Sequence, residues 1–208
     1  MKEFIRKHSQ TLINWIVFIG IGRWIVVTAW DWHRAGELWS FVQMAFLAHM
    51  ALLLVFIVVR TRHVGIDANY FHQAIALVAF FSGLALRGSD TTNGTLLLSA
   101  NAVGLVATVL GILTLLNLGR SFGILIALRK IKTDWLYGII RHPMYFTDIL
   151  FLLGLLLKKP SWLNLAIFTI GVSAYVYRAL LEEKFLSESE EYREYMKRVK
   201  YRFIPGIF

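Results

Sequence analysis

The sequence has no cysteine among its 208 residues. Disulfide bonds, thiolate metal sites and cysteine nucleophiles are therefore excluded. Histidines are few and scattered, at His8, His33, His49, His63, His72 and His142. Membrane desaturases and hydroxylases need several histidines at close helical spacing to hold their metal, and these six include no such pair. The sequence therefore predicts no metal site.

Acidic residues are also scarce, with 13 Asp and Glu against 22 Lys and Arg, which gives a formal net charge of +9. An excess of this size can attract nucleic acid, so the placement of the basic residues decides its meaning. They lie at the ends of apolar runs, and no recognition-helix or zinc-finger pattern accompanies them. This placement favours anionic lipid headgroups, and we expect no nucleic-acid partner.

Apolar residues make up 57% of the chain, above the roughly 45–50% usual in soluble domains. They fall in long runs that suit a bilayer core about 30 Å thick. The sequence therefore predicts an all-α fold, a polytopic transmembrane helical bundle forming a single membrane domain over residues 1–208. Six segments are expected to be helical: Thr11–Trp30, Trp39–Val59, Tyr70–Leu86, Leu96–Leu118, Met144–Leu157 and Leu163–Leu181.

The C-terminal region, 119–208, differs from the four expected spans of 1–118. Its first apolar segment, Met144–Leu157, has only fourteen residues, which is short for a helix that crosses a bilayer alone. With Leu163–Leu181 it is expected to form a helical hairpin. Beyond it, apolar side chains recur at helical spacing through Glu188–Tyr201, after a capping box formed by Ser187 and Glu190. This pattern predicts a short amphipathic cytoplasmic helix.

Basic residues also predict the orientation in the membrane. The N-terminal stretch Met1–His8 is basic, and the segment after the fourth span contains five Lys and Arg, at Arg120, Arg129, Lys130, Lys132 and Arg141, against one acid, Asp134. The loop with Asp31, Arg34 and Glu37 and the loop with Arg87 and Asp90 are nearly neutral. By the positive-inside rule, both termini and the 119–143 segment should face the cytoplasm. Lys158 and Lys159, at the expected outer tip of the hairpin, are the exception.

Charged and polar side chains gather where the expected hairpin opens. The cluster consists of Arg141, His142, Pro143, Tyr145, Asp148, Arg178, Glu182 and Glu183. Polar groups at a membrane are energetically costly and are candidates for function. Alternating charges at this boundary fit two interpretations, a salt-bridged collar that stabilises the hairpin and a ligand-binding site. Spacing alone does not separate them.

Several motifs in this region occur in a recognisable order. Asn117-Leu118-Gly119-Arg120-Ser121-Phe122 is followed by Lys132-Thr133-Asp134-Trp135-Leu136-Tyr137-Gly138, by Arg141-His142-Pro143-Met144-Tyr145, by Glu182-Glu183, and by Tyr192, Tyr195, Val199 and Phe203-Ile204-Pro205. In this order the motifs resemble the isoprenylcysteine carboxyl methyltransferase family, which is itself similar to the phospholipid N-methyltransferases. The resemblance runs from about Asn117 to Pro205.

This resemblance implies a membrane enzyme that uses S-adenosylmethionine and acts on a small lipidic or prenyl-like acceptor. It places His142, Pro143, Tyr145, Glu182, Glu183, Tyr192, Ile204 and Pro205 in the cofactor pocket. It assigns Arg141 and Arg178 to a carboxylate of cofactor or substrate, and it gives Glu182 a part in catalysis as well. No general base is needed for a carboxylate acceptor, whereas an amine or thiol must lose a proton, to His142, Asp148 or a glutamate.

Two positions depart from the family pattern. Thr147 stands where the family often has glycine, and Glu188-Ser189 replaces the usual Phe-Gly pair. A soluble methyltransferase is excluded because no strand-turn-helix glycine fingerprint exists. Carboxyl O-methylation is the leading interpretation, phospholipid N-methylation is the enzymatic alternative, and a non-catalytic membrane bundle is the alternative of another class.

Overall fold

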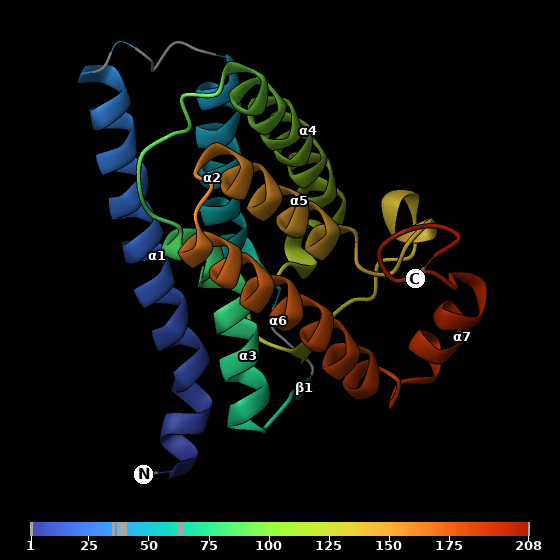
Figure 1. The fold of residues 1–208 in the computed structure, drawn as a ribbon. Helices are drawn as coiled ribbons and strands as arrows, with labels where there is room; N and C mark the ends of the chain where they lie inside the picture. Colours follow the sequence, from blue (N-terminus) through green and yellow to red (C-terminus); the bar gives the residue numbers. More distant parts are fainter. Residues whose placement is uncertain (1, 35, 37–40, 62–64, 208) are drawn as a thin grey trace.

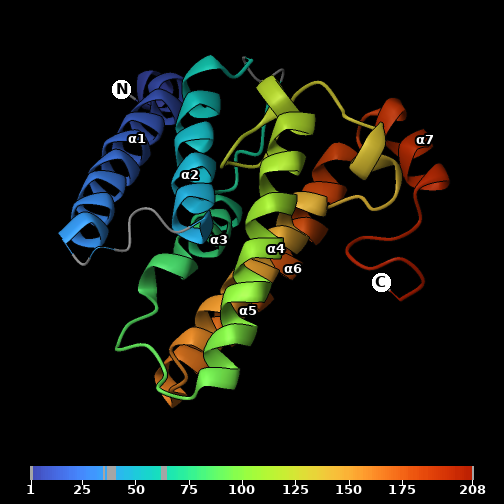
Figure 2. The ribbon, with the colours of Figure 1, turned by 90° about the horizontal axis from the view of Figure 1, so that it is seen from above.

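The computed structural model describes residues 2–34, 36, 41–61 and 65–207, so Met1, Glu37, Trp39 and His63 lie outside the described residues. Its fold is mostly helical, as the sequence predicts. The helices are α1 (Lys2–Arg34), α2 (Phe41–Val59), α3 (Tyr70–Phe81), α4 (Gly94–Leu118), α5 (Pro143–Lys158), α6 (Trp162–Leu186) and α7 (Glu190–Arg198), with 3-10 turns η1 (Ser82–Ala85), η2 (Gly119–Ser121) and η3 (Trp135–Gly138). Helix α1 forms one edge of the molecule, and α7 with the C-terminal tail forms the opposite edge (Figures 1 and 2).

Four described helical segments are long and apolar enough to cross a membrane: Trp15–Arg34, Val42–Val59, Gly94–Ser121 and Trp162–Leu186. The expectation of six spans is not confirmed. Helix α3 has 12 residues and α5 has 16, whereas a span needs about 20. Both segments are helical as expected but shorter than a bilayer is thick.

Helix α5 packs mainly along α4 and less extensively against α6. Gly154 makes the close approach to α4 possible, because a Cβ atom there would lie 3.1 Å from the backbone nitrogen of Gly104 and 3.3 Å from the carbonyl oxygen of Ala100. Small residues at helix interfaces are the usual means of close packing in membranes. The expected hairpin of α5 with α6 is therefore not confirmed as the main packing unit of this region.

The segment between α4 and α5 crosses the end of the bundle that carries the site. Gly119 ends α4 with a φ of +56°, a backbone conformation that favours glycine. Arg120 then donates from Nε to the carbonyl oxygen of Val59 at 2.9 Å, which caps α2. Further on, the short strands β1 (Gly65–Ile66) and β2 (Ala127–Leu128) pair in antiparallel register, Gly65 opposite Leu128. These contacts fix the backbone on either side of residues 121–126.

The predicted amphipathic helix is present as α7. Tyr192 and Tyr195 on α7 and Val199 directly after it are buried, and Ile131 and Leu186 pack against them. The predicted capping box is wrong. Ser187 is the C-cap of α6, and Ser189, the N-cap of α7, makes no side-chain capping bond.

Candidate functional site

A cavity opens between the 118–132 segment, η3, the start of α5, the end of α6 and α7. It contains about 950 Å³ of space not filled by protein atoms, part of it open to solvent. Its polar lining includes Arg129, Lys130, Lys132, Tyr137, Arg141, His142, Tyr145, Asp148, Arg178, Glu182, Tyr192 and Tyr195, and its apolar lining includes Leu53, Phe80 and Met144. A charged, partly aromatic cavity thus lies beside apolar helices.

Glu183 lies behind this cavity, in contact with three basic side chains. Its Oε1 accepts from Nε of Arg141 at 2.7 Å and lies 3.1 Å from Nε2 of His142. Its Oε2 accepts from Nε of Arg202 at 3.0 Å. The Glu183 side chain is only 8% exposed, so both carboxylate oxygens are desolvated and bound by protein donors. This carboxylate has the contacts of a structural ion-pair network.

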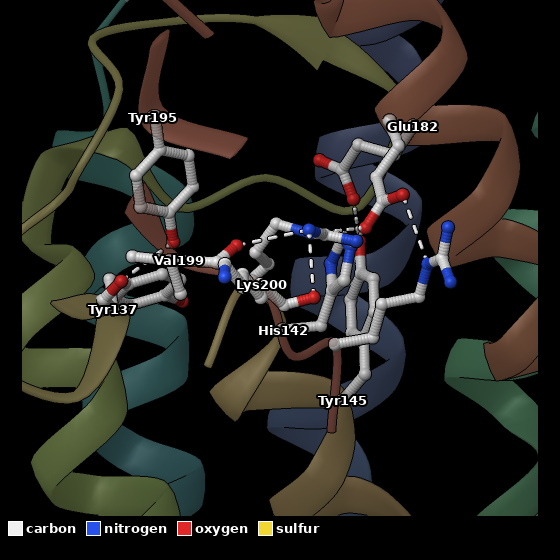
Figure 3. A network of polar contacts seen from close by, with 10 residues as sticks. Tyr137, His142, Tyr145, Glu182, Tyr195, Val199 and Lys200 are labelled. Carbon is white, nitrogen blue, oxygen red and sulfur yellow. Dashed lines mark hydrogen bonds and ion pairs between the residues drawn. The ribbon is translucent and has the colours of Figure 1, made fainter. Parts of the chain in front are cut away.

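The C-terminal tail is attached to the start of α5 through the same residues. Backbone N–H groups of Arg141 and His142 donate to the carbonyl oxygens of Tyr201 and Arg202, each at 2.9 Å. Nη1 of Arg141 donates to the carbonyl oxygens of Val199 and Lys200, at 3.0 and 3.1 Å (Figure 3). The Arg141 donors are thus largely used to hold the tail and Glu183.

His142 is the N-cap of α5, with φ −125° and ψ 56°. The following Pro143 disfavours helical backbone at this position, as the sequence predicts. The His142 ring stacks on Tyr145 with a centroid distance of 5.3 Å and an interplanar angle of 7°. The ring is therefore held between Glu183 and Tyr145, at the cavity wall.

Glu182, unlike its neighbour, lines the cavity. Its Oε2 accepts a hydrogen bond from the hydroxyl of Tyr145 (Figure 3). Above the Tyr145 ring lies the guanidinium of Arg178, 4.7 Å from the ring centroid, in cation–π geometry. Glu182, Tyr145 and Arg178 therefore form one polar wall that joins α5 to α6.

Arg178 also connects this wall to the other elements. It donates to the carbonyl oxygens of Ala76, Gly123 and Ile124, at 3.3, 3.3 and 2.6 Å. These acceptors come from α3 and from the segment after η2. Arg178 thus links α6 to α3 and to the segment after η2. Its contact with the Tyr145 ring lies at the cavity.

Tyrosines form the side of the cavity nearest α7. The hydroxyl of Tyr195 donates to the carbonyl oxygen of Tyr137 at 2.7 Å (Figure 3). Burial raises the pKa of Tyr137 and of Tyr192 above the ordinary range of tyrosine. Both phenols are therefore neutral at physiological pH, and they can donate or accept hydrogen bonds.

Six of the residues that the family resemblance assigns to the site lie on the cavity: Arg141, His142, Tyr145, Arg178, Glu182 and Tyr192. Asp148, a candidate base in the sequence, lines it as well. Glu183 is buried behind it. Pro143, Ile204 and Pro205 line a different, almost wholly apolar cavity, with Leu110, Thr114 and Phe146 among its other walls. These three residues are thus separate from the charged wall of Glu182.

Arg129 is a cavity residue that no sequence motif indicates. It follows β2, is 8% exposed and lines the cavity. Burial lowers its pKa, an effect that nearby Glu182 and Tyr145 oppose. Its only signal in the sequence is membership of a basic run, which does not distinguish it from Lys130 or Lys132. The pairing of β1 with β2, which positions it, has no clear sequence signature.

Comparison with known proteins agrees with the motif order. Residues 95–193 match the family model of phospholipid methyltransferases, a family that includes the isoprenylcysteine carboxyl methyltransferases. The family resemblance of the sequence is thereby confirmed at the family level. No curated protein matches the chain. The match and the apolar helices together indicate an integral membrane methyltransferase.

Proposed function

We propose that this protein transfers a methyl group from S-adenosylmethionine to a small lipidic or prenyl-like acceptor, by carboxyl O-methylation. One observation carries the proposal: the family match, 95–193, contains all six cavity residues that the resemblance assigns to the site. They come from α5, α6, α7 and the segment before α5. The methyl donor would supply an electrophilic methyl group on a sulfonium, and the protein has to bind and orient both ligands and exclude water.

The cavity has groups that fit such a donor. The Glu182 carboxylate is positioned by Tyr145, so it can receive an ammonium group or ribose hydroxyls. The neutral phenol of Tyr192 and the stacked rings of His142 and Tyr145 give aromatic surface next to it. Arg178 adds positive charge on the same wall. A zwitterionic, aromatic ligand is complementary to this combination.

An acceptor with a carboxylate needs orientation and no proton removal, because its nucleophile is already ionised. Arg178, held at the cavity wall by three carbonyl oxygens and the Tyr145 ring, adds positive charge that favours such an anion. The separate apolar cavity, with about 490 Å³ of space not filled by protein atoms and part of it open to solvent, is lined by residues of α4, η3, α5 and the tail. Its lining is compatible with the lipid part of an acceptor. The termini and the cavity are proposed to face the cytoplasm.

Phospholipid N-methylation is the second candidate, favoured by the description of the matching family. An amine acceptor must lose a proton, and the Glu182 carboxylate and the Asp148 side chain both line the cavity where a base would be needed. The two reactions share the donor and differ in the bond formed. They are distinguished by the chemical stability of the product.

The test uses purified full-length protein in lipid nanodiscs with methyl-labelled S-adenosylmethionine and an extract of membrane lipids. Carboxyl methylation predicts label that alkali releases as volatile methanol. Phospholipid N-methylation predicts alkali-stable label in the headgroup fraction. If no label were incorporated from any extract, while the protein remained folded by its thermal transition, the enzymatic proposal would be contradicted.

A further inference from the structure

The guanidinium of Arg129 is buried at the cavity with hydrogen-bonding capacity to spare. Over the part of the chain that the structure describes, its buried Nε and Nη2 have no hydrogen-bond partner. Space for the group is made by Gly123, because a Cβ atom there would collide with Nη1 of Arg129. Both Gly123 and Arg129 line the cavity. The backbone thus makes room for a buried cation whose donors the protein leaves unused.

The other arginines on the cavity are different. Arg141 donates to Glu183 and to two carbonyl oxygens of the tail. Arg178 donates to three backbone carbonyl oxygens, and only its Nε has no partner within the described ranges. These two therefore have few donors left for a ligand, although the sequence favours them as the carboxylate-binding residues. Arg129 is the better-equipped of the three.

Unused donors on a buried charge are unfavourable. A buried hydrogen-bonding group without a partner costs about 1–3 kcal/mol, and more when it is charged. A carboxylate or phosphate satisfies a guanidinium with two parallel bonds, which a single carbonyl oxygen cannot do. Glu182, an acid on the same cavity, already accepts from Tyr145 and makes no ion pair with Arg129 among the described residues. An anion from outside the chain would complete the site.

We propose that Arg129 binds an anionic group, a carboxylate or a phosphate, of a ligand in this cavity. The inference rests on the proposed methyltransferase function and adds the residue that recognises the anion. The anion can come from two ligands, as the amino-acid carboxylate of the methyl donor or as the acidic group of the acceptor. With Glu182 on the same cavity, Arg129 provides the positive half of a site for a zwitterion.

The test measures binding of two nucleosides to full-length protein in nanodiscs by calorimetry. S-adenosylhomocysteine carries the carboxylate, and S-adenosyl-3-thiopropylamine lacks only that group. If the anion belongs to the donor, Arg129→Met should weaken binding of the first by about tenfold to a hundredfold, the range for hydrogen bonds to charged groups, and leave binding of the second unchanged. Arg129→Lys should recover part of the loss, because it keeps the charge without the planar fork.

If the anion belongs to the acceptor, Arg129→Met should leave both nucleoside affinities unchanged and raise KM for an anionic acceptor. The probes are N-acetyl-S-farnesylcysteine for a carboxylate and vesicles of phosphatidylethanolamine for a phosphate. Gly123→Ala is a second variant, which retains Arg129 but displaces its guanidinium. It should change the same affinity or KM as Arg129→Met, by a smaller factor. Thermal transitions of all variants report folding.

Lys184→Met is the matched control, since it removes one positive charge from an exposed position of α6 outside the cavity lining, where screening makes single charges weak. The inference is overturned if Arg129→Met binds both nucleosides and uses both acceptors like the unmodified protein, or if Lys184→Met shows an equal loss. Failure of the unmodified protein to bind S-adenosylhomocysteine would instead contradict the proposed function. The two failures are therefore distinguishable.

Discussion

The carboxylates of Glu182 and Glu183, neighbours on α6, have different partners. Glu182 accepts from the hydroxyl of Tyr145 at the cavity, whereas Glu183 is bound by Arg141, His142 and Arg202 behind it. Successive residues of an α-helix are about 100° apart around its axis, so the two side chains cannot share one direction. A paired-glutamate motif here serves two separate tasks.

Separate substitutions should divide these tasks. Glu182→Gln is expected to weaken S-adenosylhomocysteine binding by about tenfold or more, because a charged acceptor is lost, with little change in thermal stability. Glu183→Gln should lower stability strongly, by about 3–5 kcal/mol, since it leaves buried basic groups without their counter-ion. Calorimetry and thermal unfolding on the same preparations check both. Equal effects of the two variants on binding and stability would contradict the division.

Tyr145 has two roles that substitutions can separate. Tyr145→Phe keeps the ring that stacks on His142 and lies under Arg178 but loses the hydroxyl that donates to Glu182. We expect a moderate loss of cofactor affinity, about fivefold to fifteenfold for a hydrogen bond worth about 1–1.5 kcal/mol, and a nearly unchanged melting temperature. Tyr145→Leu should lower both. If Tyr145→Phe lowered the melting temperature as much as Tyr145→Leu, the Tyr145 hydroxyl would be mainly structural.

His142 occupies a position between the structural and the ligand-facing groups. His142→Ala is expected to raise the dissociation constant of S-adenosylhomocysteine, because the support of the Tyr145 ring is lost, and also to lower stability through Glu183. His142→Gln should recover part of the stability, since its amide can still donate to that carboxylate. Affinity, thermal stability and methyl transfer are measured together. Normal binding with reduced stability in both variants would remove His142 from the ligand site.

The close packing of α5 on α4 depends on one small residue. Gly154→Val should destabilise the protein by about 1–3 kcal/mol, as overpacking usually does, because its Cβ atom would approach the Gly104 backbone at 3.1 Å. Gly20→Val is the matched control, since no atom lies within 4 Å of a Cβ atom there. Thermal unfolding in detergent compares the two. A larger loss for Gly20→Val would contradict this packing.

Orientation in the membrane is tested by labelling, which the absence of native cysteine makes direct. Asp134→Cys and Thr92→Cys each place one thiol at an exposed position, one in the basic 119–143 segment and one in the loop before α4. A membrane-impermeant reagent added outside intact cells should label Thr92→Cys only. Lys158, one of the two lysines that do not fit the positive-inside pattern, forms an ion pair with Asp90 at 3.1 Å. Labelling of Asp134→Cys from outside would reverse the assignment.

Uninterrupted apolar runs predict helices well, because such runs have few other stable structures in lipid. The first helix is longer than its expected segment Thr11–Trp30, since α1 extends over Lys2–Arg34. The expected segments Trp39–Val59 and Leu96–Leu118 correspond to α2 and α4 within two residues at the described ends. The sequence did not predict how far α3 and α5 fall short of a span, since η1 and the packing of α5 on α4 depend on tertiary contacts. Apolar composition alone cannot show that Gly154 meets Gly104.

For the site, motif order predicted which parts of the chain meet but not every role. His142, Tyr145 and Glu182 meet on one cavity, whereas Ile204 and Pro205 lie on another. The tail is attached through its backbone at 199–202, so the direction of the following side chains depends on bonds that a sequence pattern does not encode. Arg129 was not predicted as a site residue, because its position depends on the pairing of two strands of two residues each.

The most direct test of the account is a calorimetric titration of the purified, cysteine-free protein in nanodiscs with S-adenosylhomocysteine. The account predicts saturable binding at a single site, competition by S-adenosylmethionine, and a clear loss of affinity in Glu182→Gln with the fold retained. Absence of saturable binding by the folded protein, or equal affinity in Glu182→Gln, would contradict the assignment of this cavity to the methyl donor.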